Sequence, residues 1–308
     1  MMRSMMTKRI DEPTGTSTVG HEWDGIEELD TPLPRWWLLI FFSCIVFAIG
    51  YVIAFPAIPF RHSASAGVLG WSSHGDLDTQ LAAERQRRAP LLRAIAATPI
   101  TDLPANPQLL AQAVEGGRAA FKVHCVQCHG AGAAGSKGYP NLNDDDWLWG
   151  GDLATLEYTL TNGIRNPDHE ATRLSLMPAF GEILTPAEIN RVVAHVRLIS
   201  GQQKPNAASA AGAVLFAANC AVCHGPEGKG GREVGAPNLS DAIWLYGGDT
   251  AAIRASITVP HAGVMPRWGN RLDAVTIRML AAYVHSLGGG EATPAPVATA
   301  EGGADGGA

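Results

Sequence analysis

Two copies of one short pattern hold the residues of this chain that are best suited to chemistry. The pattern is Cys-x-x-Cys-His, read as CVQCH at residues 125–129 and as CAVCH at residues 220–224. On a short helical turn, two thiols at this spacing can bond to the two vinyl groups of one haem, and the histidine can bind its iron. We therefore predict two covalently bound haem c groups. The predicted ligands are Cys125, Cys128, Cys220 and Cys223 for covalent attachment and His129 and His224 for iron.

Zinc is the alternative occupant of such a motif, because Cys-x-x-Cys is also a zinc-binding spacing. A zinc site would need two further ligands at each copy, and it would not require a histidine directly after the second cysteine. Both copies carry that histidine, at positions 129 and 224. Two copies, each near the start of a repeated segment, favour haem.

A sixth iron ligand is predicted from a second repeated pattern, Met-Pro, in MPAFG (177–181) and MPRWG (265–269). A thioether is a soft ligand, and His/Met ligation raises the reduction potential of haem iron. We expect Met177 and Met265 to be these ligands. His169 and His261 lie in the same predicted loops but do not recur at equivalent positions. Met279 is expected to fill a helical core. The sequence leaves open whether each methionine serves its own repeat.

Longer repeats surround these residues. PNLNDDDWLWGGD (140–152) matches PNLSDAIWLYGGD (237–249). Each copy reads as a helix, the cysteine motif, a glycine-rich loop, a second helix, Met-Pro and a last helix. The repeated Trp147 and Trp244 could donate an indole N–H to a haem propionate or pack on the haem edge.

Helix start signals mark the last helix of each copy. Thr185 and Glu188 predict a capping box, and Asp273 predicts an N-cap in the second copy. No run of alternating polar and apolar residues suggests a sheet. We predict an all-α protein with two tandem class I cytochrome c domains, at 106–203 and 204–290.

An apolar run, WWLLIFFSCIVFAIGYVIAF, covers residues 36–55 without a charge. A helix of this length would cross the hydrocarbon core of about 30 Å. The alternative is a cleaved signal peptide, for which Ala64-Ser65-Ala66 resembles a cleavage site. The run is longer than a usual signal core, and a long acidic segment precedes it, so we expect an uncleaved anchor.

The rest of the 308 residues is expected to connect these parts. Residues 1–35 are predicted as an N-terminal segment, 56–105 as a connector with a helix at 74–97, and 291–308 as a disordered tail. The net charge of −6 argues against nucleic-acid binding. Four of the five cysteines lie in the two motifs, which leaves only Cys44 and no disulfide framework.

The anchor and its surroundings resemble one family closely. TPLPRWWLLIFF, GYVIAFPAIP and GVLGWSS, followed by the two haem modules, are similar to the dihaem subunit III of cbb3-type cytochrome c oxidases. The resemblance runs from Leu29 to Leu287. It implies an electron-transfer subunit that is not an enzyme on its own. Electrons would pass from a soluble or membrane cytochrome c toward the oxygen-reducing haem–copper subunit of a proton-pumping complex.

The resemblance also implies partners and a location. The partners would be the catalytic haem–copper subunit and a monohaem cytochrome c subunit. The chain would cross the bacterial inner membrane once, with residues 1–35 in the cytoplasm and both haem domains in the periplasm.

Two other functions stay open from the residues alone. A dihaem cytochrome of a periplasmic dehydrogenase would share the haem modules but would not need this anchor. A dihaem peroxidase would need one iron with an exchangeable site, whereas both modules here supply a methionine.

Overall fold

A computed structural model describes residues 8–292 of the chain. The chain divides into one unit that ends at Arg87 and a second that begins at Arg88. Of the predicted C-terminal tail, only Glu291 and Ala292 are among the described residues. The Glu291 carboxylate accepts a hydrogen bond from the amide of Gly151 at 2.7 Å and pairs with Arg232.

The first unit contains an antiparallel hairpin that the sequence patterns did not predict. Its strands are β1 (Thr18–Trp23) and β2 (Ile26–Leu29), and they form the one sheet among the described residues. Asp24 and Gly25 turn the chain with φ values of 50° and 86°. Two such residues give the type I′ turn that suits a hairpin, so the Asp-Gly pair was the available signal. The other regular elements of the described residues are helices, as predicted.

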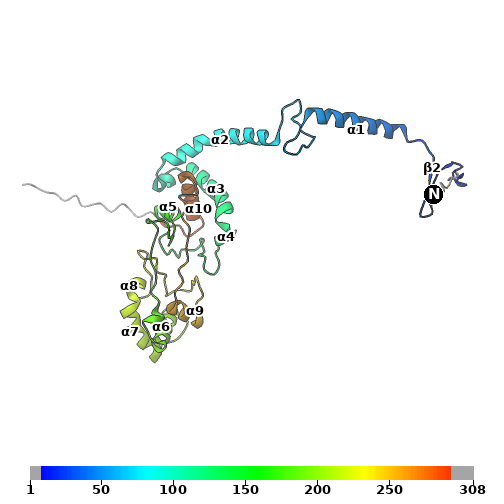
Figure 1. The fold of residues 1–308 in the computed structure, drawn as a ribbon. Coiled ribbons are helices and arrows are strands. Elements are labelled where there is room, and N and C mark those ends of the chain that lie inside the picture. The colour runs from blue at the N-terminus through cyan, green and yellow to red at the C-terminus, as the bar shows by residue number, and fades with distance from the viewer. Residues whose placement is uncertain (1–7, 293–308) are drawn as a thin grey trace, which may run out of the picture. The chain divides into compact units, whose positions relative to one another are not determined.

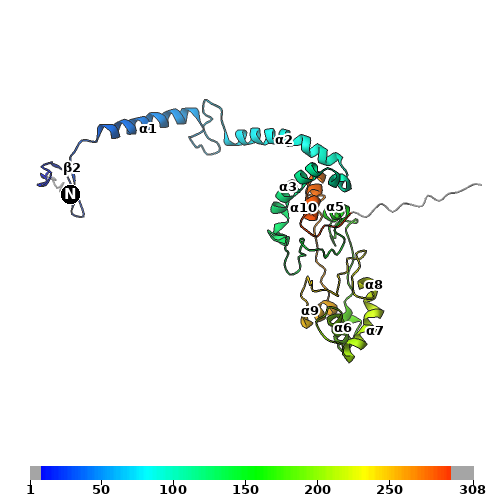
Figure 2. The ribbon, with the colours of Figure 1, turned by 180° about the vertical axis from the view of Figure 1, so that it is seen from behind.

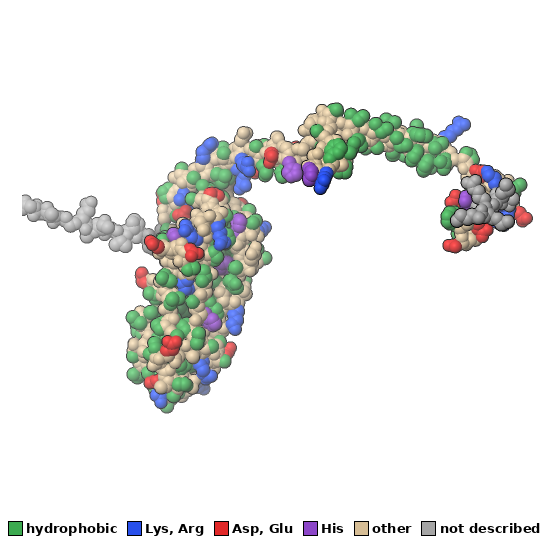
Figure 3. All heavy atoms as spheres, viewed as in Figure 1, with side chains coloured by type: hydrophobic (Ala, Val, Ile, Leu, Met, Phe, Trp, Pro, Cys, Tyr) green, Lys and Arg blue, Asp and Glu red, His purple; other side chains and the backbone are tan. Residues whose placement is uncertain are grey.

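The predicted membrane span is confirmed as a helix, α1 (Arg35–Ala54). None of its side chains is buried, and apolar side chains cover it (Figure 3). It is the one helix of the described residues that is long and apolar enough to cross a membrane. A helix that exposes apolar groups on every side needs an apolar surrounding, which a lipid bilayer provides.

The GVLGW stretch folds back over the end of α1. The amide groups of Val68 and Leu69 donate to the carbonyls of Ile53 and Ala54, at 2.9 and 3.2 Å. Gly67 has φ +68°, and a Cβ there would lie 2.4 Å from the Ala54 carbonyl oxygen. The segment therefore satisfies carbonyls that the helix end leaves without partners, and it needs a glycine to approach them.

The chain then enters the second unit through α2 (Ser73–Ala97), which the sequence predicted at 74–97. A short helix, η1 (Ile100–Ala105), follows Pro99. Ile95 and Leu103 are fully buried. Residues of the predicted connector thus contribute to the core of the second unit.

Nine further helical segments belong to the two sequence repeats. Repeat 1 (106–203) and repeat 2 (204–290) supply similar elements in the same order. They are α3 (Pro107–His124), α4 (Val126–His129), α5 (Leu153–Asn162), η2 (Phe180–Glu182) and α6 (Pro186–Ile199) in repeat 1, and α7 (Ala207–Asn219), α8 (Ala221–His224), α9 (Thr250–Thr258) and α10 (Ala274–His285) in repeat 2.

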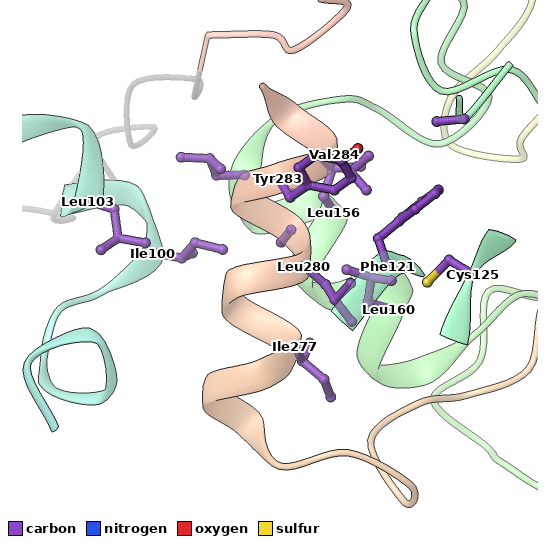
Figure 4. Close-up of a cluster of buried hydrophobic side chains, with 13 residues drawn as sticks. Ile100, Leu103, Phe121, Cys125, Leu156, Leu160, Ile277, Leu280, Tyr283 and Val284 are labelled. Carbon is purple, nitrogen blue, oxygen red and sulfur yellow. The ribbon is translucent and has the colours of Figure 1, made fainter. Parts of the chain in front are cut away.

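The first group of helices, lobe 1, contains α3, α4 and α5 of repeat 1 together with α10 of repeat 2 (Figures 1 and 2). Side chains from α3, α5 and α10 meet in one core (Figure 4). Its buried members are Ile100, Leu103, Phe121, Cys125, Ala133, Leu153, Leu156, Leu160, Ile277, Leu280, Ala281, Tyr283 and Val284.

The second group, lobe 2, contains α7, α8 and α9 of repeat 2 together with η2 and α6 of repeat 1 (Figures 1 and 2). Its buried core consists of Phe180, Ile189, Val192, Val193, Val196, Phe216, Cys220, Ile253 and Ile257. Each lobe is therefore completed by the last helix of the other repeat. The ranges predicted at 106–203 and 204–290 are those of the sequence repeats. The two lobes do not follow these ranges, because the last helix of each repeat packs in the lobe of the other.

One glycine in each lobe allows the exchanged helices to approach closely. A Cβ at Gly117 on α3 would lie 1.9 Å from the carbonyl oxygen of Met279 on α10. A Cβ at Gly212 on α7 would lie 1.9 Å from the carbonyl oxygen of Arg191 on α6. Both glycines are buried, and at each position only a residue without a side chain fits.

The predicted helix starts are confirmed. The Thr185 hydroxyl accepts from the Glu188 amide at 3.3 Å, and the Glu188 carboxylate accepts from the Thr185 amide at 2.9 Å. The Asp273 carboxylate accepts from the amides of Val275 and Thr276 at 3.0 Å. These caps start α6 and α10, the two exchanged helices.

Candidate functional site

The first cysteine motif lies on one tight turn at the end of α3. Cys125 ends α3 and precedes α4. Its carbonyl oxygen accepts from the amides of Cys128 and His129, at 3.1 and 2.9 Å. This turn holds the two cysteines and the histidine within one segment of helix, as attachment to one haem requires.

The second motif repeats this geometry at the end of α7. The Cys220 carbonyl accepts from the amides of Cys223 and His224, at 3.2 and 3.0 Å. The structure therefore places the two cysteines and the histidine of each motif together, in lobe 1 for the first motif and in lobe 2 for the second.

Each motif histidine is oriented by a proline carbonyl. His129 Nδ1 lies 3.1 Å from the Pro140 oxygen, and His224 Nδ1 lies 3.0 Å from the Pro237 oxygen. A carbonyl only accepts hydrogen bonds, so each Nδ1 carries the proton and each Nε2 keeps its lone pair for a metal. Such a partner behind a histidine ligand fixes both its tautomer and its orientation.

Burial supports the same neutral form. It lowers the pKa of His129 and of His224, an effect that the hydrogen bonds to Pro140 and Pro237 partly offset. The two prolines were quoted in the sequence repeat but were given no role there. The signal was available, because PNL stands at the same place in both copies.

The first cysteine of each motif is buried and the second is more accessible. Burial, with a smaller contribution from the neighbouring motif cysteine, raises the pKa of Cys125 and of Cys220 to about 11. None of the four forms a disulfide in the described part of the chain. Among residues 8–292, no group of three or more His, Cys, Asp or Glu side chains is arranged to hold a metal ion.

The two Met-Pro segments lie one at each lobe. The side chain of Met265 packs against the core of lobe 1. Met177 is 36 % exposed and precedes η2, whose Phe180 is buried in the core of lobe 2. Met279 is buried in a hydrophobic cluster with Ile95, which confirms its predicted role in a core.

The sequence suggested an indole hydrogen bond to a propionate for both repeated tryptophans, and the structure gives the Trp147 indole another partner. The indole N–H of Trp147 donates to the carbonyl of Gly289, so the suggestion that it serves a propionate is wrong for this residue. A Cβ at Gly151 would lie 2.2 Å from the indole nitrogen of Trp147, and one at Gly248 would lie 2.5 Å from Cδ1 of Trp244. The second glycine of each Gly-Gly pair thus makes room for the indole ring of its repeat.

The two competing loop histidines already have partners. His169 Nε2 lies 2.8 Å from the Asn162 side-chain oxygen. His261 stacks on Tyr246 with ring centroids 4.0 Å apart. Neither arrangement is repeated in the other half of the chain, in contrast to the two Met-Pro segments.

Asp146 should make the stability of the chain depend on pH. Burial, followed by the nearby Asp241 and the adjacent carboxylates, raises its pKa to about 6. The unfolded chain ionises this group near pH 4. Below about pH 4 the carboxyl is protonated in both states, and the free energy of unfolding is at its full value. As pH rises through about 6, the folded chain must hold the unfavourable charge, and the free energy of unfolding falls. Asp146→Asn should therefore add about 1–2 kcal/mol at pH 7, allowing for partial exposure, and almost nothing at pH 4.

Urea unfolding of the haem-loaded chain at pH 4 and pH 7 would measure this difference. Asp168→Asn, which removes the same charge from an exposed loop position, is the control. If Asp146→Asn raised the free energy of unfolding equally at both pH values, the result would contradict the raised pKa of Asp146.

Known proteins match this chain over most of its length. Residues 112–196 and 207–284 match the family described as cytochrome c oxidase, cbb3-type, subunit III. Residues 15–62 match the N-terminal domain of cytochrome oxidase-cbb3, FixP. The second match covers the hairpin, α1 and the start of the segment that follows it.

Individual relatives are similar over nearly their whole length. A cbb3-type cytochrome c oxidase subunit CcoP from Cereibacter sphaeroides is 50% identical over 282 residues, covering 91% of this chain and 97% of the relative. A subunit FixP of such an oxidase from Azorhizobium caulinodans is 50% identical over 283 residues, with 92% and 96% covered. A FixP subunit from Rhizobium meliloti is 48% identical over 285 residues, with 92% and 98% covered.

Proposed function

The chain belongs to the subunit III family of cbb3-type cytochrome c oxidases, and on that premise we propose how it carries electrons. It is the membrane-anchored electron-transfer subunit that passes electrons from a donor cytochrome toward the haem–copper subunit. The observation that supports this best is the repeated site in which a Cys-x-x-Cys-His turn meets a proline carbonyl. Two such sites give the chain two haem c groups.

Each repeat contributes the same set of haem ligands. Two cysteines would attach the haem, and a histidine and a methionine would bind its iron. When bound, the haem supplies one-electron redox chemistry, and His/Met ligation holds its potential high. The proposed ligands are Cys125, Cys128, Cys220 and Cys223 for attachment, and His129, His224, Met177 and Met265 for iron.

The protein around each site serves electron transfer and does not serve oxygen chemistry. The proline carbonyls keep Nε2 of His129 and His224 available, and the buried side chains of each lobe exclude water. With both protein ligands bound, the iron would have no position left for oxygen. The reduction of oxygen therefore takes place in a partner, the haem–copper subunit, and the chain is not an enzyme on its own.

The anchor meets that partner in the membrane. α1 places Ser43, Ala48 and Gly50 among its larger apolar residues, and small residues let a neighbouring helix approach. We place residues 1–35 in the cytoplasm and both lobes in the periplasm, where covalent haem attachment takes place in this family. A monohaem cytochrome c subunit would complete the electron path within the complex.

Respiring membranes from cells that lack this chain test the proposal. Oxygen uptake driven by reduced soluble cytochrome c should be lost and should return when the full chain is supplied. A chain with all four motif cysteines changed to alanine should be inserted in the membrane without restoring uptake. If deletion leaves uptake and oxidase assembly unchanged, the oxidase role fails and the cytochrome of a dehydrogenase becomes the better assignment.

A further inference from the structure

One arginine, Arg165, binds both of the loops that lead to the Met-Pro segments. Its Nε donates to the carbonyl of Gly263 at 2.7 Å, and Nη1 of the same guanidinium donates to the carbonyl of Ser175 at 3.3 Å. Gly263 stands two residues before Met265, and Ser175 stands two residues before Met177. We propose that Arg165 positions both methionine loops and raises the reduction potentials of both haems through its positive charge. This inference rests on the iron ligands proposed above.

The two hydrogen bonds act at equivalent points of the two loops. Two residues of extended chain span about 7 Å at most, so each accepting carbonyl lies close to its methionine. The donors of a guanidinium are fixed in one plane, so one side chain can hold two carbonyls at a defined separation. A shift of either loop would therefore break or bend a hydrogen bond to Arg165.

The main chain also places Arg165 between the two loops. The preceding residue, Ile164, and Met265 donate to each other's carbonyls, both at 3.0 Å. The amide of Arg165 itself donates to the carbonyl of Arg173 at 2.8 Å, and Arg173 lies four residues before Met177. The main chain thus joins this segment to both loops, and the Arg165 side chain adds a second contact to each.

The backbone of Arg165 adopts a conformation that does not favour an arginine. Its φ is 52°, in the left-handed region that is uncommon for residues with a side chain and that glycine adopts readily. Such a conformation persists only where the surrounding structure holds it, and it is frequent at functional sites. The turn therefore does not require an arginine here, whereas the two loop contacts do.

The charge of Arg165 is partly removed from water. The side chain is half-buried, and burial lowers its pKa, an effect that Tyr246 partly offsets. An arginine nevertheless stays protonated. Asp168 and Glu170 line the same cavity of about 620 Å³, but in the described part of the chain neither forms an ion pair with Arg165. A half-buried positive charge is screened less than an exposed one, and it favours Fe(II) over the more positive Fe(III).

Repeat 2 has no counterpart of Arg165. Between the end of α9 and Met265 the chain reads VPHAGV (259–264), without a lysine or an arginine. The guanidinium of Arg165 reaches this segment from repeat 1, at Gly263. A single side chain thus serves both loops, so its loss should alter both haems.

Redox titration and absorption spectra of haem-loaded variants test the proposal. Arg165→Gly removes the side chain and suits the positive φ, so the fold should be kept. At a fixed potential, the ratio of reduced to oxidised iron should fall several-fold at both haems, and both sulfur–iron absorption bands should weaken. Arg165→Lys keeps the charge but lacks the fork of donors. In this variant both potentials should return toward the wild-type values, while the two bands stay weaker.

Lys204→Gln is the control, because it removes one positive charge from an exposed position between α6 and α7 and should change neither haem. Urea unfolding reports the stability of each variant separately. If Arg165→Gly lowers only the free energy of unfolding and leaves both potentials and both bands unchanged, the proposal is overturned.

Two further results would also overturn it. A change at one haem alone would contradict the bridging role of Arg165, and equally low potentials in the Gly and Lys variants would contradict the role of its charge. A wild-type chain without any sulfur–iron band would instead contradict the methionine ligands of the proposed function. The two failures are therefore distinguishable.

Discussion

A chain with Cys125→Ala and Cys128→Ala should carry one covalent haem in place of two. Only a thioether bond keeps haem on a denatured chain, and these two sulfurs are the proposed attachment points of the first site. The mass of the denatured chain should fall by one haem group relative to the wild-type chain, apart from the two small side-chain changes. Mass spectrometry after denaturation measures this directly.

Cys44→Ala is the matched control, because Cys44 lies in α1 and belongs to neither motif. This variant should keep both haems. A wild-type chain that loses all of its haem on acid–acetone extraction would contradict covalent attachment at both sites.

Gly117→Ala adds only one methyl group, yet it should destabilise the chain strongly. The new Cβ would lie 1.9 Å from the Met279 carbonyl oxygen and 2.7 Å from Cβ of Tyr283. Backbone atoms cannot turn aside, so α3 and α10 would have to move apart. Overpacking costs about 1–3 kcal/mol or more, and the better helix propensity of alanine returns only about 1 kcal/mol. We expect a net loss of about 2 kcal/mol, measured by denaturant unfolding of the haem-loaded chain.

Gly212→Ala tests the same contact in lobe 2, where the new Cβ would lie 1.9 Å from the Arg191 carbonyl. Gly132→Ala is the control, since nothing lies within 4 Å of a Cβ there. Equal stability of the Gly117 and Gly132 variants would show that α3 and α10 are not in contact in solution.

Features that depend on neighbouring residues were predicted well from the sequence. The apolar span agrees with α1 within one residue at each end, because length and absence of charge define such a helix. The caps at Thr185 and Asp273 agree because a cap is a contact between residues two or three apart. The turn of each cysteine motif is equally local. The hairpin at Asp24 and Gly25 was within reach by the same reasoning and was missed.

Contacts between distant segments could not be predicted in this way. The Trp147 indole donates to the Gly289 carbonyl, and the charge of Asp241 contributes to the raised pKa of Asp146. In both cases the partner comes from the other repeat. No spacing in the sequence specifies such a pair, because only the folded chain brings the two segments together.

By itself, the sequence determined the two cysteine motifs, the repeated methionines, the helices around them and the membrane anchor. Only the tertiary structure decided which last helix completes which lobe. The physical reason is the likeness of the repeats: Ile189 and Val192 on α6 occupy the places that Ile277 and Leu280 occupy on α10. Either helix presents an apolar stripe that suits either core, so periodicity cannot choose between them. The choice depends on contacts across the whole unit, including the close approach of α10 at Gly117 and of α6 at Gly212.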